Sequence, residues 1–239
     1  MSRVTTARKR GRPPLLTREQ VLAASVELLQ EAPLDAFTMQ SVAKKLNVAP
    51  MTLYGYFPSR DALLQSVAED VFGRLNVTSV RQVRDWRERV RLWCHIVHTQ
   101  LIEIPELVRL INQPSQLNST WLEASAPLCE AMLDARFSDE RALFFTRWIS
   151  RNLIGLSLFE GYMDAAVHQT PREHQGLLHA KLSPETYELY ARVGPHAFGM
   201  DTRQLFKLSV ESWITTLEQE LANHTLETSR ADARSTAPN

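Results

Sequence analysis

Apolar residues recur at helical spacing along most of this chain, in blocks separated by turn signals. The first block begins with Thr17 and Gln20, which are placed to form a capping box, and it ends before Pro33. The second block, residues 37–57, predicts two short helices joined at Asn47, a residue type that tolerates the left-handed turn conformation. We therefore predict an all-α fold that starts with three short helices.

The 37–57 segment has the pattern of a helix-turn-helix. Thr38 is placed to cap its first helix, and Pro50 stands where a helix favours its first residue. Ala49 offers no capping hydroxyl to the second helix, a loss of about 1 kcal/mol. Leu53 is expected to point inward from that helix. Its exposed face would carry Met51, Thr52, Tyr54, Gly55 and Tyr56.

A larger helical body is predicted over residues 61–223, with a connecting helix over residues 59–75. One apolar face with spacings of 3 and 4 residues predicts a helix from Val83 to Leu101, which Pro105 ends. Five arginines within this stretch or just before it are expected on a solvated face, interleaved with two acidic residues. They are Arg81, Arg84, Arg87, Arg89 and Arg91, with Asp85 and Glu88.

The same periodicity predicts helices over residues 107–111, 119–137, 139–166 and 202–222. The two longest of these carry more apolar residues than one buried face can hold, so they need cover on a second side. Residues 168–200 are irregular except for one short helix after Pro184. Residues 1–15 are predicted to form a flexible arm, and residues 224–239 a disordered tail.

Charge is unevenly distributed, although the whole chain is net neutral. Residues 1–60 hold nine Lys and Arg against four Asp and Glu, whereas the rest holds eighteen against twenty-three. A basic N-terminal head on an acidic body suits a polyanionic partner at one end only, unless the asymmetry is chance.

The N-terminal arm contains KRGRPP, residues 9–14, which resembles an AT-hook. In such a motif the glycine lets the backbone approach the floor of an A·T-rich minor groove, and Arg10 and Arg12 would meet its negative potential. The alternative is a basic tail that only aids solubility. The position of the motif, directly before the helix-turn-helix, favours the minor-groove arm.

Composition argues against several other classes of protein. The hydrophobic content of 44% and charged content of 23% are those of a soluble protein, and no apolar run is long enough to span a membrane. Cys94 and Cys129 lack partners at metal or redox spacing, so a reduced cytoplasmic protein is expected. His95 and His98 have no third ligand, and the chain lacks phosphate-loop, nucleophile-elbow and zinc-protease motifs. We expect no metal, no cofactor and no enzymatic activity.

Three pieces of sequence now support a resemblance. FTMQSVAKKLNV, TLYGYF and SRDALL, in this order and spacing, resemble the DNA-binding domain of TetR-family transcriptional regulators over roughly residues 17–75. The usual glycine of the turn is Asn47 here, and the usual capping hydroxyl residue is Ala49. The resemblance implies a helix-turn-helix domain over residues 16–60 and a helical domain for ligand binding and dimerisation behind it.

DNA is the partner that this resemblance implies, and side-chain chemistry suggests a role for each exposed group. Hydroxyls and a guanidinium suit phosphates, and the resemblance gives the same role to Thr38, Tyr54, Tyr56 and Arg60. Base edges are expected to meet Gln40, Met51, Thr52 and Gly55, with an apolar contact from Pro50 nearby. Partial burial of Tyr54 or Tyr56 is the alternative for those two.

The body resembles tetracycline-repressor-like C-terminal domains more loosely, through DWRERV and Pro105. Its two longest helices resemble the pair that builds a four-helix bundle in a family homodimer, with burial inside one subunit as the alternative. The expected interface residues are Ile154, Gly155, Leu158, Leu205, Leu208 and Ser212. The aromatic residues that would line an effector pocket, each of them otherwise ordinary core, are Trp93, Trp121, Phe144, Phe145, Trp148, Phe159 and Tyr162.

These expectations combine into a regulator, most simply a repressor. It would bind a palindromic operator as a dimer and release it when a small molecule binds the body. The alternative within DNA-binding proteins is a nucleoid-type binder that needs no ligand.

Overall fold

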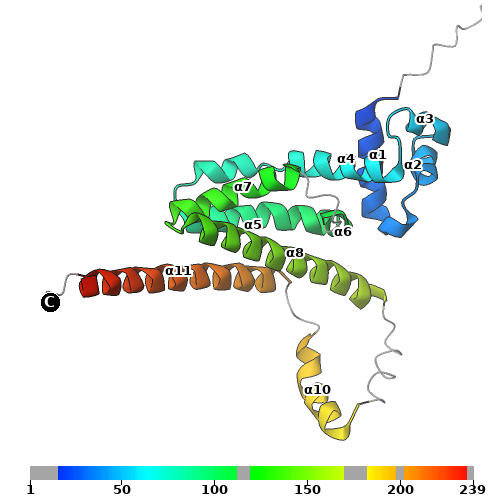
Figure 1. The fold of residues 1–239 in the computed structure, drawn as a ribbon. Helices are drawn as coiled ribbons and strands as arrows, with labels where there is room; N and C mark the ends of the chain where they lie inside the picture. The colour runs from blue at the N-terminus through cyan, green and yellow to red at the C-terminus, as the bar shows by residue number, and fades with distance from the viewer. Residues whose placement is uncertain (1–15, 112–118, 170–181, 198–201, 236–239) are drawn as a thin grey trace, which may run out of the picture. The chain divides into compact units, whose positions relative to one another are not determined.

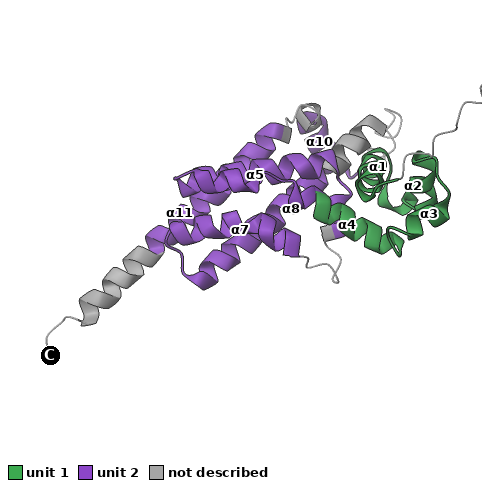
Figure 2. Cartoon of the chain, turned by 90° about the horizontal axis from the view of Figure 1, so that it is seen from above, with its two compact units in different colours: residues 1–70 green, residues 71–239 purple. Residues whose placement is uncertain are grey.

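The computed structural model describes residues 16–111, 119–169, 182–197 and 202–235, and every regular element within them is helical (Figure 1). The predicted all-α fold is confirmed. The chain divides into two compact units, residues 1–70 and residues 71–239, drawn in green and purple in Figure 2. The division falls inside the connecting helix, α4 (Arg60–Gly73).

The N-terminal unit contains α1 (Arg18–Glu31), a short 3-10 helix (Leu34–Ala36), α2 (Met39–Lys45), α3 (Pro50–Tyr54) and most of α4. Helix α2 packs against both α1 and α3. The core between them is formed by side chains at most 1% exposed, including Val21, Val42, Leu53, Phe57 and Leu63. Burial of these apolar side chains orients the short helices, which are too short to be stable alone.

The sequence features that predicted the helix caps and the turn of this unit are confirmed. Thr17 and Gln20 form the predicted capping box of α1. Thr38 caps α2, and Ser41 completes a second box by binding back to the Thr38 amide. Asn47 has φ 54°, so the turn between α2 and α3 uses the left-handed conformation that the sequence suggested.

The second unit contains a 3-10 helix (Val77–Gln82), α5 (Trp86–Glu103), α6 (Leu107–Ile111), α7 (Ser119–Asp134), α8 (Asp139–Gln169), α10 (Pro184–Ala197) and α11 (Thr202–Ser235). Helices α5, α7 and α8 pack on one another, and α11 packs against α5 and α8. The predicted inward face of α5 is confirmed for Val90, Trp93, Val97 and Leu101, which are all fully buried.

Several helix ends differ from their predicted positions. Helix α5 begins at Trp86 rather than Val83, because the Asp85 carboxylate caps it through the Arg87 amide at 2.7 Å. Helix α7 ends at Asp134, where Arg136 turns left-handed at φ 75° and the next amide bonds back into the helix. Helix α11 continues past its predicted end to Ser235, into the stretch that had been predicted as a disordered tail.

Arg89 corrects one sequence-based prediction. It was expected on a solvated face, but it is 5% exposed. Its guanidinium forms an ion pair with Asp134, and Nη2 donates to the carbonyl oxygen of Pro127. The charge of Arg89 predicted exposure to solvent. The side chain can be buried because α7 supplies an anion and a carbonyl oxygen that bind the guanidinium.

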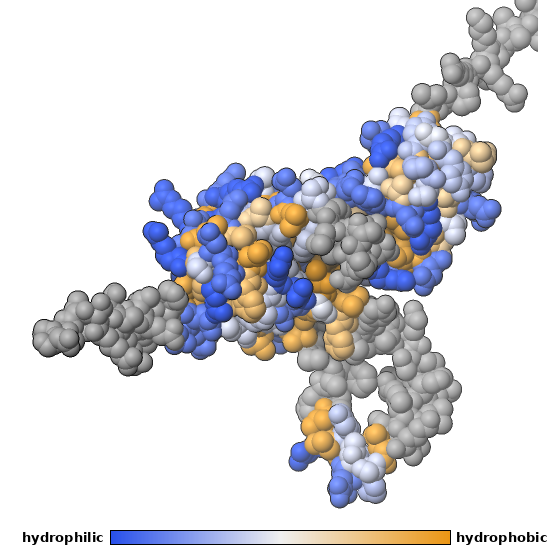
Figure 3. All heavy atoms as spheres, viewed as in Figure 1, coloured by the Kyte–Doolittle hydropathy of each residue, from blue (hydrophilic) through white to orange (hydrophobic). Residues whose placement is uncertain are grey.

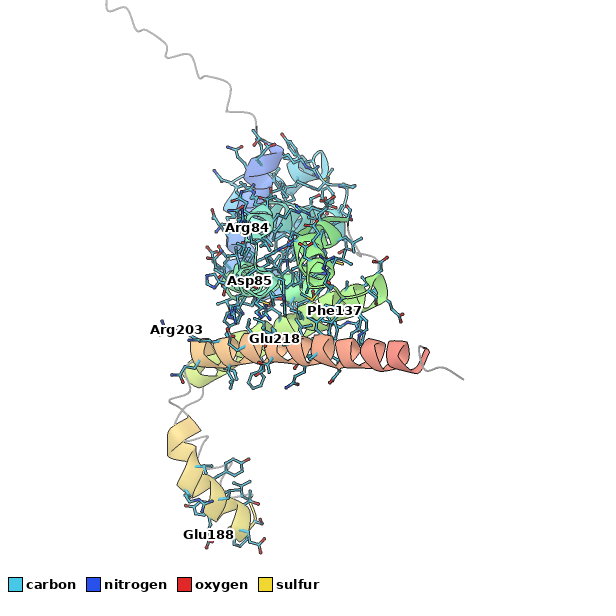
Figure 4. All side chains as sticks on the ribbon, turned by 90° about the vertical axis from the view of Figure 1, so that its left-hand side faces the viewer. Arg84, Asp85, Phe137, Glu188, Arg203 and Glu218 are labelled. Atoms are coloured by element: carbon cyan, nitrogen blue, oxygen red, sulfur yellow. The ribbon has the colours of Figure 1, made fainter. Side chains whose placement is uncertain are left out.

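Polar contacts attach α11 to the rest of its unit around a small apolar seam. Arg91 pairs with Glu211 at 2.6 Å, and Arg87 pairs with Glu218, a side chain labelled in Figure 4. Arg141 on α8 pairs with Glu220. Buried contacts come from Val210, Trp213, Ile214 and Leu217. These pairs fix the register of α11, although half-exposed ion pairs stabilise little individually.

Candidate nucleic-acid interface

Helix α3 presents a surface of uncharged side chains. Met51 is 77% exposed and Tyr54 is 46% exposed, while Leu53 between them is fully buried. Pro50, Thr52 and Gly55 are also exposed. The short helix is therefore held by one inward leucine and offers its other side chains to a partner. Its exposed groups are suited to base edges and sugar-phosphate oxygens, without any net charge.

Helix α2 contributes two exposed positions beside this surface. The Thr38 hydroxyl accepts from the Ser41 amide at 3.0 Å, so its oxygen caps α2. Gln40 lies exposed in the first turn of the same helix. At the other end, Lys44 is exposed, whereas Lys45 contacts Glu27 and Glu31 of α1 at 3.0 and 2.9 Å. These acids raise the pKa of Lys45, the hydrogen bond to Glu31 most.

Arg60, predicted at a phosphate, has its donors directed into its own unit. Nε donates to the carbonyl oxygen of Phe37 and Nη2 to that of Leu34, both at 2.8 Å. Nη1 lies 3.5 Å from the Asp61 carboxylate. The guanidinium thus links the start of α4 to the turn that precedes α2. These bonds use two of the five N–H donors of the guanidinium and hold its plane against the turn.

Tyr56 is half-buried rather than fully exposed, and its hydroxyl donates to the carbonyl oxygen of Leu16. Because α3 ends at Tyr54, Tyr56 lies beyond the helix, and the chain there directs its ring toward the start of α1. This fits the alternative of partial burial left open for Tyr54 and Tyr56.

Arg18 is a residue whose position sequence reasoning missed. Nη1 donates to the Tyr56 carbonyl at 3.3 Å, and Nη2 donates to the Ser66 hydroxyl at 2.8 Å. Its guanidinium also lies 4.2 Å from the centre of the Phe57 ring. In the sequence, only the position of Arg18 just after the Thr17 cap marked it as part of a helix. Arg10 and Arg12 themselves lie outside the described residues.

The aromatic residues predicted to line one effector pocket are dispersed. Trp93 is buried, and its indole donates to the Ala124 carbonyl at 2.7 Å. It meets Trp121 edge-on, and Trp121 in turn meets Phe72. A second cluster joins Phe137, Phe144, Phe145, Trp148 and Trp213. Phe144 and Phe159 are more than half exposed, and the Tyr162 side chain lies outside the described residues.

Two open hollows occur on the body within the described ranges. One, of about 320 Å³, lies between the α7–α8 turn and α11, where Arg141 and Glu220 contribute to its wall. The other, of about 450 Å³, lies between α8 and α11 and is lined by Arg151, Asn152, Gly155, Leu156, Ser209 and Trp213. Of the aromatics predicted for a pocket, neither hollow includes one. Over the same ranges no cluster of three or more metal-ligating side chains occurs.

Of the predicted dimer residues, Gly155 lines the second hollow. Leu208 is 65% exposed, Gly155 and Ser212 are exposed, and Ile154, Leu158 and Leu205 are half-buried. A Cβ built on Gly155 would have nothing within 4 Å. Figure 3 shows hydrophobic side chains on the surface of this unit among hydrophilic ones. The α8–α11 face therefore has room for another helix to approach closely.

His98, on α5, contacts side chains of both α8 and α11. Its Nδ1 lies 2.9 Å from the Ser157 hydroxyl, which itself donates to the Leu153 carbonyl. The imidazole stacks on Phe206 of α11 with a centroid distance of 4.2 Å. Burial, and to a smaller extent the nearby His95, lower the pKa of His98 to about 4. The ring is therefore neutral at pH 7, and its Nδ1 shares one hydrogen bond with the Ser157 hydroxyl.

Several known proteins resemble this chain in sequence. The family model described as bacterial regulatory proteins of the tetR family matches residues 21–67. The nucleoid occlusion factor SlmA of Marinobacter nauticus is 37% identical over 84 residues, which span 34% of this chain and 43% of that protein. The class G tetracycline repressor protein of Vibrio anguillarum is 27% identical over 154 residues, 63% of this chain and 71% of that protein.

Solved structures extend the likeness over the body. ActR of Streptomyces coelicolor in complex with actinorhodin has a TM-score of 0.66 at 20% identity, over 86% of this chain and 98% of ActR. BioQ with its natural double-stranded DNA operator has a TM-score of 0.54 at 22% identity, over 62% of this chain and 88% of BioQ. At such identities the likeness is one of fold. No helix in the described part of the chain is long and apolar enough to cross a membrane.

Proposed function

We propose that this chain is a DNA-binding transcriptional regulator of the TetR family, and that it is a repressor that binds a palindromic operator as a homodimer and is released by a small-molecule effector. The exposed, uncharged surface of α3 on a rigid helical core is the observation that carries the proposal. The likeness to a class G tetracycline repressor supports the repressor role.

The reading surface consists of Gln40, Met51, Thr52 and Gly55 at base edges, with Pro50 beside them. Met51 and the Thr52 methyl suit thymine methyl groups, and the Gln40 amide suits an adenine edge. Tyr54 and Thr38 would bind phosphates, and Arg10 and Arg12 would enter the adjacent minor groove. Tyr56 would reach a phosphate only by giving up its bond to the Leu16 carbonyl oxygen, and Arg60 already donates to the carbonyl oxygens of Phe37 and Leu34. We therefore assign both residues to holding the reading helix in place.

A second copy of the chain is required because the surface of α3 has no charged side chain. One such head gains little from the phosphate backbone, which dominates affinity for DNA. We propose that Ile154, Gly155, Leu158, Leu205, Leu208 and Ser212 form the dimer interface. Two heads related by twofold symmetry would then read a palindrome with half-sites one helical turn apart.

The proposed effector is a small molecule that binds the helical body. ActR binds actinorhodin in its complex, and a fold of this kind supports a ligand in the helical body here. The aromatic clusters around Trp93, Trp121, Phe144, Phe145 and Trp148 are candidates for its walls, with Phe159 and Tyr162 further along α8. A ligand that favours one arrangement of the body would shift the population away from the DNA-binding state.

Tyr54→Ala tests the reading surface. Duplexes selected from a random-sequence library by the wild-type chain serve as the probe. We expect Tyr54→Ala to lower affinity about tenfold or more, as loss of a DNA contact does, without changing the melting temperature. Tyr190→Ala, a similarly exposed tyrosine on α10, is the matched control and should bind as wild type. A large fall in the melting temperature of the Tyr54 variant would contradict the assignment.

The match to SlmA, a nucleoid occlusion factor, favours one second candidate, a nucleoid-type DNA binder without a ligand. Footprinting separates the two. A regulator protects a short palindrome in the selected duplexes and leaves unrelated duplexes unprotected at the same concentration. Uniform protection of unrelated duplexes would decide for the nucleoid-type binder.

A further inference from the structure

The reading helix α3 is short and has no side-chain cap at its start. It spans five residues, Pro50–Tyr54, and the residue before it, Ala49, makes no capping hydrogen bond. Leu53 is its buried residue. A helix of this length is not stable alone, so its direction depends on how its ends are held.

The backbone just beyond α3 closes back on the helix. The amides of Tyr56 and Phe57 both donate to the Leu53 carbonyl oxygen at 2.9 Å. The Phe57 ring is 1% exposed, so it anchors this segment in the core of the N-terminal unit. A group that holds the backbone at Tyr56 therefore also holds the last turn of the reading helix.

Arg18, the first residue of α1, connects this segment with α4. Nη1 donates to the Tyr56 carbonyl oxygen at 3.3 Å, and Nη2 donates to the Ser66 hydroxyl at 2.8 Å. The guanidinium lies 4.2 Å from the centre of the Phe57 ring. A planar guanidinium can serve two acceptors and a ring face at once, whereas the ammonium group of lysine is a point charge without that shape.

The exposure of Arg18 offers a rival role, a phosphate contact of its own. Two of its five N–H donors are used in the bridge, and three remain for another acceptor. A phosphate contact needs a positive charge with a donor, which lysine also supplies. The bridge needs the shape of arginine and the hydroxyl of Ser66, so the two roles respond differently to the same substitutions.

We propose that Arg18 is a positioning residue for DNA binding. Its guanidinium holds the backbone just beyond α3 against α4, and so fixes the direction in which the exposed face of α3 meets base edges. The inference rests on the proposed reading role of α3, and it gives Arg18 an indirect part in sequence recognition.

Arg18→Lys in the full chain keeps the charge and removes the bridge. The probes are a duplex selected by the wild-type chain and a scrambled duplex of the same length and composition. Binding to the selected duplex should weaken about 3- to 10-fold, the range of one net hydrogen bond. Binding to the scrambled duplex should change less than about twofold, because backbone contacts carry no sequence information. Equal losses on both duplexes, or no loss on either, would overturn the proposal.

Ser66→Ala keeps Arg18 and removes its acceptor on α4. It should weaken binding to the selected duplex about 2- to 5-fold alone, and less than about 1.5-fold when combined with Arg18→Lys. Equal losses in both backgrounds would contradict the bridge. The neighbouring Gln65 bonds Glu69 of the same helix at 3.0 Å, so Gln65→Ala is the matched control and should bind as wild type. A loss as large as that of Ser66→Ala would count against the proposal.

Salt dependence separates positioning from a direct contact. Arg18→Gln removes the charge as well as the bridge. For a positioning residue, the slope of log K against log salt concentration on the selected duplex should equal that of wild type. Loss of a phosphate contact makes this slope shallower by about 0.9, and that outcome would replace the proposal with a direct contact.

Hydrogen exchange without DNA tests the bridge itself. Arg18→Lys should raise exchange at the amides of Tyr56 and Phe57 about 3- to 10-fold and leave α2 unchanged. Unchanged exchange at both amides refutes the bridge while the proposed function stands. If the wild-type chain selects no duplex from the random library, the proposed function fails, and the inference fails with it whatever the exchange result.

Discussion

The guanidinium Nε of Arg60 donates a hydrogen bond to the carbonyl oxygen of Phe37, 2.8 Å away. A second bond from Nη2 to the Leu34 carbonyl, also 2.8 Å, completes a fork over the turn before α2. A planar guanidinium can satisfy two carbonyls at once, which a lysine cannot do with the same geometry. The first residue of α4 thereby holds the turn that leads into α2.

Arg60→Ala should lower the free energy of unfolding of the N-terminal unit by about 1–3 kcal/mol, because two carbonyl oxygens lose a charged donor. Arg60→Lys should recover part of the loss through one remaining bond. Urea denaturation followed by circular dichroism measures both. Lys44→Ala, an exposed cation of the same unit, should change stability by less than about 0.5 kcal/mol. An alanine variant as stable as wild type would contradict the structural role.

The buried Arg89 depends on its partner on α7. Asp134→Asn should destabilise the body by about 1–3 kcal/mol, since a guanidinium that is 5% exposed keeps its charge and loses its nearest anion. Glu130→Gln should cost less, about 1 kcal/mol at most, because Glu130 lies 3.6 Å from Arg89 and mainly serves the exposed Arg81. Thermal unfolding ranks the losses of stability of the two variants. A larger loss for Glu130→Gln than for Asp134→Asn would show that Glu130 is the main counter-ion of Arg89.

Acid should weaken the packing around His98. Its pKa in the folded protein is lowered to about 4 from 6.5, so the unfolded chain takes up the proton first. Stability from the neutral imidazole is therefore complete above about pH 6.5 and is lost as the pH falls toward 4. His98→Phe keeps the stack on Phe206 and removes the proton. Between pH 7.5 and 5 the urea midpoint should fall less steeply with pH for this variant than for wild type. An equal fall in both proteins would exclude His98 as a source of the pH dependence.

Cys94 should resist alkylation in the native protein. It is fully buried, and burial raises the pKa of its thiol far above the ordinary value, which leaves almost no thiolate. Native protein treated with iodoacetamide at pH 8 should therefore be modified at the half-buried Cys129 before Cys94, as peptide mass spectrometry can resolve. Both should react in guanidinium chloride. Rapid native labelling of Cys94 would mean that the core between α5 and its neighbours opens readily.

Short-range signals in the sequence predicted the local structure of the head well. The capping box at Thr17, the cap at Thr38, the left-handed Asn47 and the inward Leu53 are all found as expected. Each depends on groups within a few residues, so the reason for it is legible in the chain itself. The exposed face of α3 followed from the same periodicity, with Tyr56 as the exception because the helix ends before it.

For long polar side chains the sequence carried the least information about contacts. Arg18, Arg60 and Arg89 carry charge, and charge at an isolated position predicts solvent or a phosphate. Their partners lie between 23 and 48 residues away, a relationship that no local pattern contains. The aromatic residues of the body had the same ambiguity, because a periodic pattern places a ring on a face without stating which other ring it will meet.

By itself, then, the sequence determined that the chain is helical, that residues 37–57 form a helix-turn-helix and which face of α3 is exposed, because backbone hydrogen bonding and apolar periodicity act within a few turns. Only the tertiary structure decided that Tyr56, Arg18 and Arg60 hold that helix-turn-helix together, since those bonds exist only where distant segments meet. Burial of Arg89 was likewise decided there, because a charged side chain enters a core only when another helix brings it an anion and a carbonyl oxygen.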